Sequence, residues 1–273
     1  MAQSGELKVA MLGASGRMGR SIIPLIAADA DGVRLSGALA GPGDKAIGQD
    51  AGSFAGSAPL AVTITDQLSR ALAGADVAID FTLADASVRH AAACRDAKCA
   101  LVIGTTGHSA AQRAELDAIA RGMPIVLAPN MSPGVNLLFK LAELAGRALG
   151  GDRYDAEIFE AHHRNKVDAP SGTALGLGRA VAQGRGVALE DVADYARHGN
   201  TGVREHGRIG FSVLRGGDIV GDHRLIFAGP GEQIELAHHA QDRSGFARGA
   251  LLAARWVAGR PPGLYSMMDV LGL

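Results

Sequence analysis

The chain has 273 residues, and its 27 lysines and arginines balance 28 aspartates and glutamates, so the formal net charge is −1. Hydrophobic residues make up 47% of the chain and charged residues 20%, a composition that excludes a mainly disordered protein. The balanced charge argues against a nucleic-acid-binding protein, whose basic residues should form a patch. A chain of this length is expected to form one or two domains with a sizeable core.

The amino-terminal segment, the lengths of the apolar runs and the number of cysteines indicate where in the cell the protein is found. The amino-terminal segment lacks the basic region and long apolar run of a signal peptide, and no apolar run approaches the ~18 residues of a membrane span. Two cysteines, Cys94 and Cys99, are too few for a disulfide framework, and we expect them to be small buried residues rather than a redox pair. These features predict a cytoplasmic protein without a membrane partner.

The first half of the chain alternates short apolar runs with segments of helical spacing. Strands are expected at 7–12, 33–39, 77–81, 101–103 and 125–128, and helices at 18–28, 86–96 and 110–120. Continuous apolar strands separated by helices indicate a parallel sheet that is covered on both faces. Such sheets bind ligands at the carboxyl ends of their strands.

The pattern changes after Asn130. Helices are expected at 135–149 and 172–183 and a strand at 155–161, followed by three successive strands at 208–214, 218–227 and 233–240 and a last helix at 246–258. Successive strands with short glycine-containing turns indicate an antiparallel or mixed sheet. We therefore predict an α/β protein: a Rossmann-type parallel-sheet domain formed by 1–130 and 241–273, and an α+β domain with a mixed sheet formed by 131–240.

A glycine-rich turn follows the first expected strand. Gly13, Gly16 and Gly19 have the spacing G-x-x-G-x-x-G, a variant of the dinucleotide fingerprint, with a strand before it and a helix after it. In this interpretation Gly13 permits a tight turn, Gly16 lets the backbone approach a pyrophosphate, and Gly19 lets the helix pack on the strand. The amino terminus of the helix stabilises the anion. Arg17, within the turn, could reach a phosphate or stack on adenine.

The residue that selects between NADH and NADPH is not evident. An acid about 20 residues beyond the turn typically binds the ribose hydroxyls. Here Ala40 and Gly41 stand at the end of the second strand, and Asp44 and Lys45 come a few residues later. The missing acid permits NADPH without excluding NADH, so the choice of coenzyme stays open.

Three further strand ends carry small polar residues that suit a nicotinamide ribose or carboxamide. They are Phe81-Thr82, the segment 104–107 and the segment 128–132. Each of them also fits an ordinary turn or a helix cap, and Ser132 is a candidate N-cap.

The densest group of ionisable residues lies in the segment 160–174, EAHHRNKVDAPSGTA. Two histidines, an arginine, a lysine and an aspartate occur within seven residues, and a Pro-Ser-Gly-Thr sequence then opens a helix. A cationic pocket facing a helix amino terminus suits a small dicarboxylate. A histidine that titrates near neutral pH can also donate a proton.

The chain contains two pairs of adjacent histidines. A metal site is not expected at His162-His163, because adjacent histidines on a strand point to opposite faces and both cysteines lie in the other domain. The pair His238-His239 has no lysine or Ser-Gly-Thr helix start near it in the sequence. We expect that pair to be mainly structural, although one of the two could line the site.

Residues 160–174 closely resemble the signature E-x-H-H-x-x-K-x-D-A-P-S-G-T-A of the 4-hydroxy-tetrahydrodipicolinate reductase family, formerly dihydrodipicolinate reductase, and match it throughout. The segments GASGRMG at 13–19, DFT at 80–82, GTTG at 104–107, NMSPGVN at 130–136 and GGDIVG at 216–221 support the resemblance, which covers nearly the whole chain. One departure matters. Relatives often place an acid, sometimes followed by arginine, where this chain has Ala40-Gly41, so coenzyme preference does not carry over.

The resemblance implies an NADH- or NADPH-dependent reduction of 4-hydroxy-tetrahydrodipicolinate to tetrahydrodipicolinate in lysine and diaminopimelate biosynthesis. It implies hydride transfer to C4, a proton from His162, and Lys166 as the catalytic partner of His162. His163, Gly172 and Thr173 resemble substrate-binding residues. The implied cofactor contacts are Gly13, Ala14, Ser15, Gly16, Arg17, Met18, Gly104, Thr105, Thr106, Ala128, Pro129, Asn130 and Met131, with a later pair, Arg243 and Phe246. Family members are typically homotetramers joined through the sheet of the second domain.

Other hypotheses predict different sequences. Another two-domain oxidoreductase, such as a homoserine dehydrogenase, should not need the complete His-His-Lys and Ser-Gly-Thr set. A non-catalytic dinucleotide sensor would have lost catalytic residues that are intact here. A nucleic-acid-binding regulator is disfavoured by the net charge of −1.

Overall fold

The computed structural model describes residues 6–28 and 32–273, and the chain divides into two compact units. Unit 1 comprises Met1–Pro133 and Arg243–Leu273, and unit 2 comprises Gly134–Asp242. The sequence-based boundaries, after residues 130 and 240, lie close to these divisions. In the described part of the chain, no helix is both long and apolar enough to cross a membrane.

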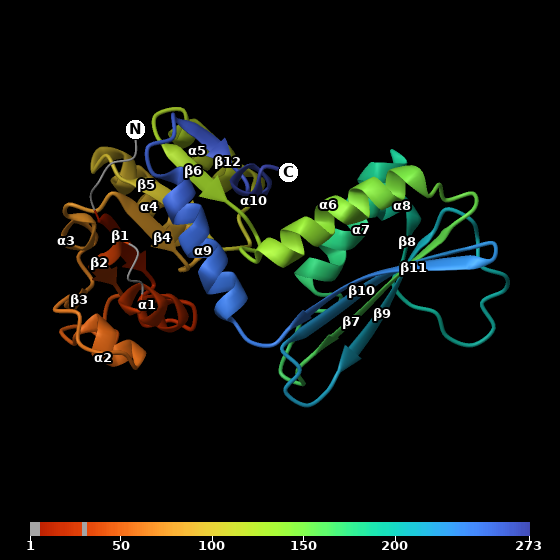
Figure 1. The fold of residues 1–273 in the computed structure, drawn as a ribbon, viewed down its shortest axis with the longest axis horizontal. Helices are drawn as coiled ribbons and strands as arrows, with labels where there is room; N and C mark the ends of the chain where they lie inside the picture. The colour runs from red at the N-terminus through yellow and green to blue at the C-terminus, as the bar shows by residue number, and fades with distance from the viewer. Residues whose placement is uncertain (1–5, 29–31) are drawn as a thin grey trace. The chain divides into compact units, whose positions relative to one another are not determined.

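Unit 1 is built on a seven-stranded sheet with the strand order β12-β6-β5-β4-β1-β2-β3 (Figure 1). The strands are β1 (Leu7–Leu12), β2 (Val33–Leu39), β3 (Ile64–Thr65), β4 (Val77–Asp80), β5 (Ala100–Ile103), β6 (Pro124–Leu127) and β12 (Gly263–Tyr265). All neighbouring strands run parallel. Every residue of β4 and β5 is buried, as expected for a parallel sheet with helices on both faces.

Two hydrophobic clusters cover the two faces of this sheet. The first contains buried residues of α1 (Gly19–Ala27) and α9 (Ser244–Val257), with contributions from α2 (Ala51–Ala55) and α10 (Met267–Leu271). The second contains buried residues of α3 (Leu68–Leu72), α4 (Ala84–Asp96) and α5 (Ala110–Ala120), together with Cys94 and Cys99. Both cysteines are buried, as expected. The predicted Rossmann-type architecture is confirmed.

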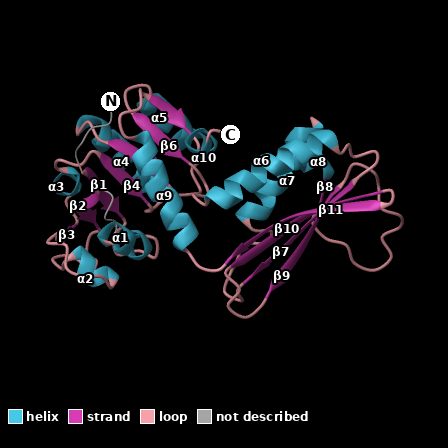
Figure 2. Cartoon of the chain, in the orientation of Figure 1, coloured by secondary structure: helices cyan, strands magenta, loops and turns pink. Residues whose placement is uncertain are grey.

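Unit 2 is built on a five-stranded mixed sheet with the order β11-β10-β7-β9-β8. Its strands are β7 (Asp155–His162), β8 (Ala193–Asp194), β9 (Ile209–Arg215), β10 (Gly221–Gly229) and β11 (Glu232–Ala240). β10 runs antiparallel to β7 and β11, whereas β7 and β8 run parallel to β9. The helices α6 (Pro133–Ala148) and α7 (Gly172–Arg185), with the short α8 (Leu189–Val192), lie on one side of the sheet (Figure 2). The predicted mixed sheet is confirmed.

Several element boundaries differ from the sequence-based ones. The strand expected at 218–227 begins only at Gly221, because residues 217–218 form a turn, and Phe81 lies in a loop after β4. The elements β3, β8, β12, α2, α3, α8 and α10 were not predicted. They have two to five residues each, too few for a hydrophobic period to show.

Candidate active site

The glycine-rich turn of unit 1 joins β1 to α1. Gly13 has a φ of 87°, and a Cβ atom placed there would lie 2.7 Å from the carbonyl oxygen of Phe81. A Cβ atom on Gly19 would overlap the carbonyl oxygens of Gly13 and Ala14, so α1 can begin directly against the turn only with glycine at position 19. Met18, the N-cap of α1, makes no side-chain capping bond, and Gly16 is exposed. The turn therefore exposes its backbone at Gly16, next to the start of α1.

A buried carboxylate organises the loops that follow β4 and β5. The Oδ1 atom of Asp80 accepts hydrogen bonds from the backbone N–H and the hydroxyl of Thr82, at 2.8 and 2.6 Å, and its Oδ2 atom lies 2.8 Å from Nδ1 of His90. The hydroxyl of Thr105 accepts from the N–H of Thr82 at 3.0 Å. The sequence analysis named these loops but not the role of Asp80. An acid that ends the otherwise apolar strand VAID was the available signal.

The predicted cofactor-binding residues of unit 1 differ in exposure. Gly16, Arg17, Thr106 and Pro129 are exposed, whereas Ala14, Thr105, Ala128 and Met131 are buried. Asn130 accepts a hydrogen bond from the N–H of Ser132 at 2.8 Å. The buried residues shape the carboxyl edge of the sheet, and the exposed ones present atoms that a ligand could contact.

Asp44 lies beside the same turn. Its Oδ2 atom accepts a hydrogen bond from the hydroxyl of Ser15 at 2.6 Å, and its Oδ1 atom accepts from the N–H of Ala46 at 2.9 Å. These bonds, led by that of Ser15, lower the pKa of Asp44 below its ordinary value. The turn therefore has an ionised carboxylate next to it at neutral pH.

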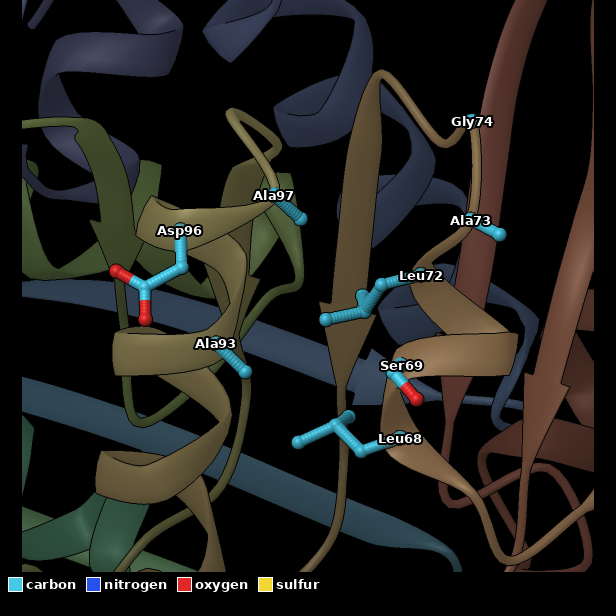
Figure 3. A pocket seen from close by; sticks show the side chains of 8 residues that line it. All are labelled: Leu68, Ser69, Leu72, Ala73, Gly74, Ala93, Asp96 and Ala97. Carbon is cyan, nitrogen blue, oxygen red and sulfur yellow. The ribbon is translucent and has the colours of Figure 1, made fainter.

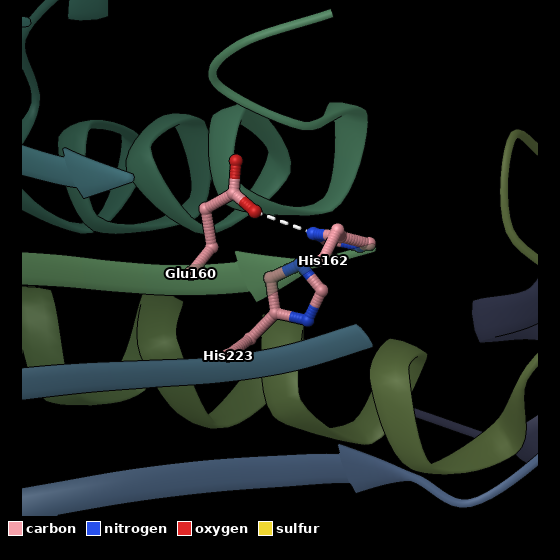
Figure 4. Close-up of side chains that lie close together, drawn as sticks. All are labelled: Glu160, His162 and His223. Carbon is pink, nitrogen blue, oxygen red and sulfur yellow. Dashed lines mark hydrogen bonds and ion pairs between the residues drawn. The ribbon is translucent and has the colours of Figure 1, made fainter. Parts of the chain in front are cut away.

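In unit 2, His162 is part of a buried polar cluster at the end of β7 (Figure 4). Its Nδ1 atom lies 2.5 Å from Oε2 of Glu160, whose carboxylate is completely buried. Arg215, from β9, donates to both oxygens of Glu160 at 2.8 and 2.9 Å, and the N–H of Ser171 donates to Oε1 at 2.9 Å. Burial alone would raise the pKa of Glu160, but the bonds from His162, Arg215 and Ser171 bring it down to about 2.

His223 completes this cluster from β10. Its Nε2 atom lies 3.0 Å from the hydroxyl of Ser171, and its ring meets that of His162 edge to face with centroids 5.1 Å apart. Burial, with the neighbouring His162, lowers the pKa of His223 to about 4, so it is neutral at pH 7. Ser171 also accepts from the N–H of Ala174 at 3.1 Å and thereby caps α7. The sequence analysis assigned no role to Arg215 or His223, although both flank the GGDIVG segment.

Glu160, His162 and His223 have ligand atoms within 4.8 Å of one another, a spacing that a metal ion could use. The expectation that no metal is bound rested on the adjacent histidines and on the cysteines of the other domain, and it did not consider this set. The hydrogen bonds of the cluster favour another description. Arg215 already brings a positive charge to both oxygens of Glu160, and a second cation would be repelled there. We describe the set as a hydrogen-bonded cluster.

The remaining predicted residues of unit 2 lie around the start of α7. His163 is half-buried, and Lys166 places its Nζ atom 2.9 Å from Oδ1 of Asp168. Gly172 is exposed in the first turn of α7 and Thr173 is half-buried there. The structure therefore brings His162, His163, Lys166 and the start of α7 to one end of the unit 2 sheet.

The pair His238-His239 lies on β11. His239 pairs with Asp222 at 3.1 Å, but His238 stands opposite His223 in the register of β10 and β11. Burial lowers the pKa of His238. The sequence has no Ser-Gly-Thr helix start near this pair, and it left open that one of the two histidines lines the site. Antiparallel pairing brings His238 next to His223, the histidine that contacts Ser171.

A groove of about 600 Å³ lies elsewhere on unit 1, between α3 and α4 (Figure 3). It is lined mainly by small and apolar residues, among them Leu68, Leu72 and Ala93. None of the residues predicted to bind cofactor or substrate lines it, so we do not assign it to the reaction.

Comparison with known proteins decides the family. The family model for the amino-terminal part of dihydrodipicolinate reductase matches residues 7–131, and the model for the carboxyl-terminal part matches residues 134–271. This chain belongs to the dihydrodipicolinate reductase family. It is accordingly an oxidoreductase that uses NAD(P)H, and the expected family, enzyme class and cofactor are confirmed.

Individual relatives agree with this assignment. The 4-hydroxy-tetrahydrodipicolinate reductase of Thiobacillus denitrificans is 57% identical over 268 residues, which are 98% of this chain and 99% of that protein. The Bordetella parapertussis reductase is 53% identical over the full length of both chains. A dipicolinate-bound dihydrodipicolinate reductase from Paenisporosarcina sp. TG-14 has the same fold, with a TM-score of 0.76 over 97% of this chain and 98% of that chain at 23% identity.

Proposed function

We propose that this reductase converts 4-hydroxy-tetrahydrodipicolinate to tetrahydrodipicolinate in lysine and diaminopimelate biosynthesis, with NADH or NADPH as reductant. The observation that carries the proposal is the buried Glu160–His162 pair beside the start of α7. It combines a histidine suited to proton transfer with a helix amino terminus suited to a carboxylate, in a family whose members bear this activity in their names.

The start of α7 is proposed to hold one substrate carboxylate. The backbone at Gly172 is exposed, and Thr173 adds a hydroxyl in the same turn. A carboxylate there would accept charge-assisted hydrogen bonds and interact favourably with the helix dipole. His163 and Lys166, close by in the chain, supply positive charge for the remaining anionic groups.

In the proposed reaction, the residues of the unit 1 turn and loops would hold a reduced nicotinamide, which would supply a hydride to C4 of the ring once the 4-hydroxyl group and a hydrogen of C3 have been lost together as water. The electron pair of the ring double bond moves toward C3 and the ring nitrogen. His162 then donates its proton to C3, which completes the reduction, and solvent reprotonates His162. Lys166 would stabilise the negative charge that develops on the ring, provided that its ammonium group leaves Asp168.

The coenzyme is proposed to bind along the carboxyl edge of the unit 1 sheet. The backbone of Gly13, Gly16 and Met18 would cradle the pyrophosphate at the start of α1, where the N-cap residue Met18 makes no side-chain capping bond. The loops at 104–106 and 128–131 would position the nicotinamide end, and the Asp80 hydrogen bonds hold the first of them in place. The described residues thus fit a dinucleotide.

A coupled assay tests the function. The protein is mixed with pyruvate, aspartate semialdehyde and the preceding synthase, and oxidation of NADH and NADPH is followed separately. We expect oxidation that requires the synthase. If either coenzyme binds but neither is oxidised while the synthase turns over, the proposed function is wrong.

We also propose a cytoplasmic homotetramer joined through the unit 2 sheet. The helices of unit 2 pack on one side of that sheet, and on the other side β9 leaves Leu214 41% exposed. An apolar residue on an uncovered sheet face suits an interface between copies. Sedimentation at micromolar concentration should give four times the chain mass of 27.9 kDa, and a monomer would refute the assembly. Cell fractionation tests the location.

A further inference from the structure

We propose that Glu160 is a positioning residue for His162. Its carboxylate accepts a hydrogen bond from Nδ1–H of His162, so that Nε2 is the ring atom that transfers a proton to the substrate. Arg215 and Ser171 hold the carboxylate in place for this purpose. The catalytic meaning of this arrangement rests on the proposed function, whereas the protonation pattern does not.

The hydrogen bonds of Glu160 require this protonation pattern. Oε2 faces His162 Nδ1 and Arg215 Nη1, and Oε1 faces Arg215 Nη2 and the N–H of Ser171. An ionised carboxylate can only accept hydrogen bonds, and these bonds keep the pKa of Glu160 at about 2, so it is ionised at neutral pH. The ring atom that faces it must therefore carry a hydrogen. Neutral His162 is consequently the Nδ1–H tautomer, with a free electron pair on Nε2.

The other side of the His162 ring has limited room. A Cβ atom at Gly221, the first residue of β10, would lie 3.0 Å from Nε2 of His162. The His162 residue is 9% exposed, so the ring has little freedom to turn away from Glu160. Glycine at position 221 therefore leaves space beside Nε2 that a larger residue would fill.

Charged and titratable groups surround His162, and they come from each of the neighbouring elements. β9 supplies the Arg215 cation and β10 supplies neutral His223, which faces His238 and Asp222. The loop after β7 supplies the Lys166–Asp168 pair. Removing the charge of Glu160 would leave the Arg215 cation without its partner beside the ring, and this changes the local charge next to the proton-transferring group.

Ser171 connects this pair to the carboxylate-binding helix start. Its N–H holds Glu160, while its hydroxyl caps α7 at Ala174 and contacts His223. The same residue thus sets the position of the proton donor and of the first turn of α7, where Gly172 and Thr173 lie. One buried cluster thus fixes the proposed proton donor and the proposed substrate-binding turn relative to each other.

The decisive variant is Glu160→Gln, with Glu157→Gln as the matched control. Glu157 lies on the same strand and also pairs with arginines, Arg197 and Arg204, but it is not in contact with His162. We expect Glu160→Gln to lower kcat by about 10²-fold, the low end for loss of a positioned general acid, with KM changed far less. Its pH–kcat profile should differ from that of the wild type, because the charge beside His162 has changed. Glu157→Gln should keep the wild-type profile.

A second measurement is independent of activity. Nitrogen-15 NMR of histidine-labelled full-length enzyme, with the His162 signals assigned by their loss in His162→Gln, should show a proton on Nδ1 and none on Nε2 at a pH where His162 is neutral. In Glu160→Gln this preference should be lost, because an amide can donate as well as accept.

The outcomes separate the two proposals. A wild-type His162 found as the Nε2–H tautomer, or a folded Glu160→Gln enzyme with unchanged kcat and pH profile, overturns the positioning role. If Glu160→Gln does not fold, Arg215→Lys keeps the charge but loses the two-pronged contact, and it should lower kcat in the same direction with less effect on KM. A wild-type enzyme without reductase activity but with the Nδ1–H tautomer would refute the proposed reaction alone.

Discussion

The hydroxyl of Ser15 donates a hydrogen bond to Oδ2 of Asp44 at 2.6 Å, although 29 residues separate them. This contact brings a carboxylate to the glycine-rich turn. The strand β2 ends at Leu39, and the next two residues, Ala40 and Gly41, are not acidic. Lys45, the residue after Asp44, is exposed. The loop after β2 thus places the acid Asp44 beside the turn, although Asp44 lies a few residues beyond the end of β2, where the acid usually stands.

We predict from this contact that the enzyme prefers NADH. A carboxylate at this edge can accept from the ribose hydroxyls and repels a 2′-phosphate. The ratio of kcat/KM for NADH over NADPH should exceed unity and should fall at least about tenfold in Asp44→Asn, equivalent to ~1.4 kcal/mol. Asp117→Asn, on the exposed face of α5, is the control. A wild-type preference for NADPH, or an unchanged ratio in Asp44→Asn, would contradict the prediction.

Loss of either proposed catalytic group should slow turnover without weakening coenzyme binding. His162→Gln and Lys166→Ala should each lower kcat by about 10²-fold or more, the effect of removing a general acid or its partner. Both residues lie in unit 2, whereas the proposed coenzyme contacts belong to unit 1, so NADH titration followed by fluorescence should give wild-type affinity. Turnover near the wild-type rate in both variants would rule out these roles.

The hydroxyl of Thr173 should matter mainly for substrate affinity. Thr173→Val keeps the shape of the side chain but removes the hydroxyl, and a hydrogen bond to a charged group contributes about 1.5–3 kcal/mol. We expect KM for the cyclic substrate to rise by roughly tenfold or more, with a smaller change in kcat. Thr201→Val, in an exposed loop of the same unit, serves as control. Equal KM values for the two variants would remove Thr173 from the carboxylate site.

Acidification should destabilise the fold through His223. Its pKa is about 4 in the folded protein against 6.5 for an ordinary histidine, so below pH 6.5 the unfolded chain takes up a proton that the folded chain does not. The contribution of His223 is present above pH 6.5 and is lost as the pH falls to 4, up to ~3 kcal/mol. Urea unfolding at pH 7 and pH 5 measures it. The loss of stability on acidification should be smaller in His223→Gln than in the wild type, and an equal loss would show that His223 isn't responsible.

A second acid-sensitive window belongs to Glu160. Its folded pKa of about 2 lies below the ordinary 4.5, so its contribution is complete above pH 4.5 and disappears as the pH falls toward 2. Stability lost between pH 4.5 and 2 should therefore be reduced in Glu160→Gln. Measurements at pH 4.5 and pH 3 on both proteins distinguish this window from that of His223.

The sequence by itself predicted the features that depend on a few neighbouring residues. The apolar runs predicted β1 and β2 to the residue, and the G-x-x-G-x-x-G spacing placed a turn with a left-handed Gly13 between a strand and a helix. These predictions succeed because strand and helix periods, and the steric freedom of glycine, act over a few neighbouring residues. The family followed from the continuous segment 160–174, which needs no knowledge of the fold.

Only the tertiary structure decided which distant residues meet. Arg215 reaches Glu160 because β9 pairs with β7, and His223 reaches Ser171 because β10 pairs with β7 on its other side. Asp44 meets Ser15 because the loop after β2 folds back onto the turn. Strand pairing and loop closure join residues 29 to 55 positions apart, and the desolvation that brings the pKa of His223 to about 4 exists only once these groups are buried together.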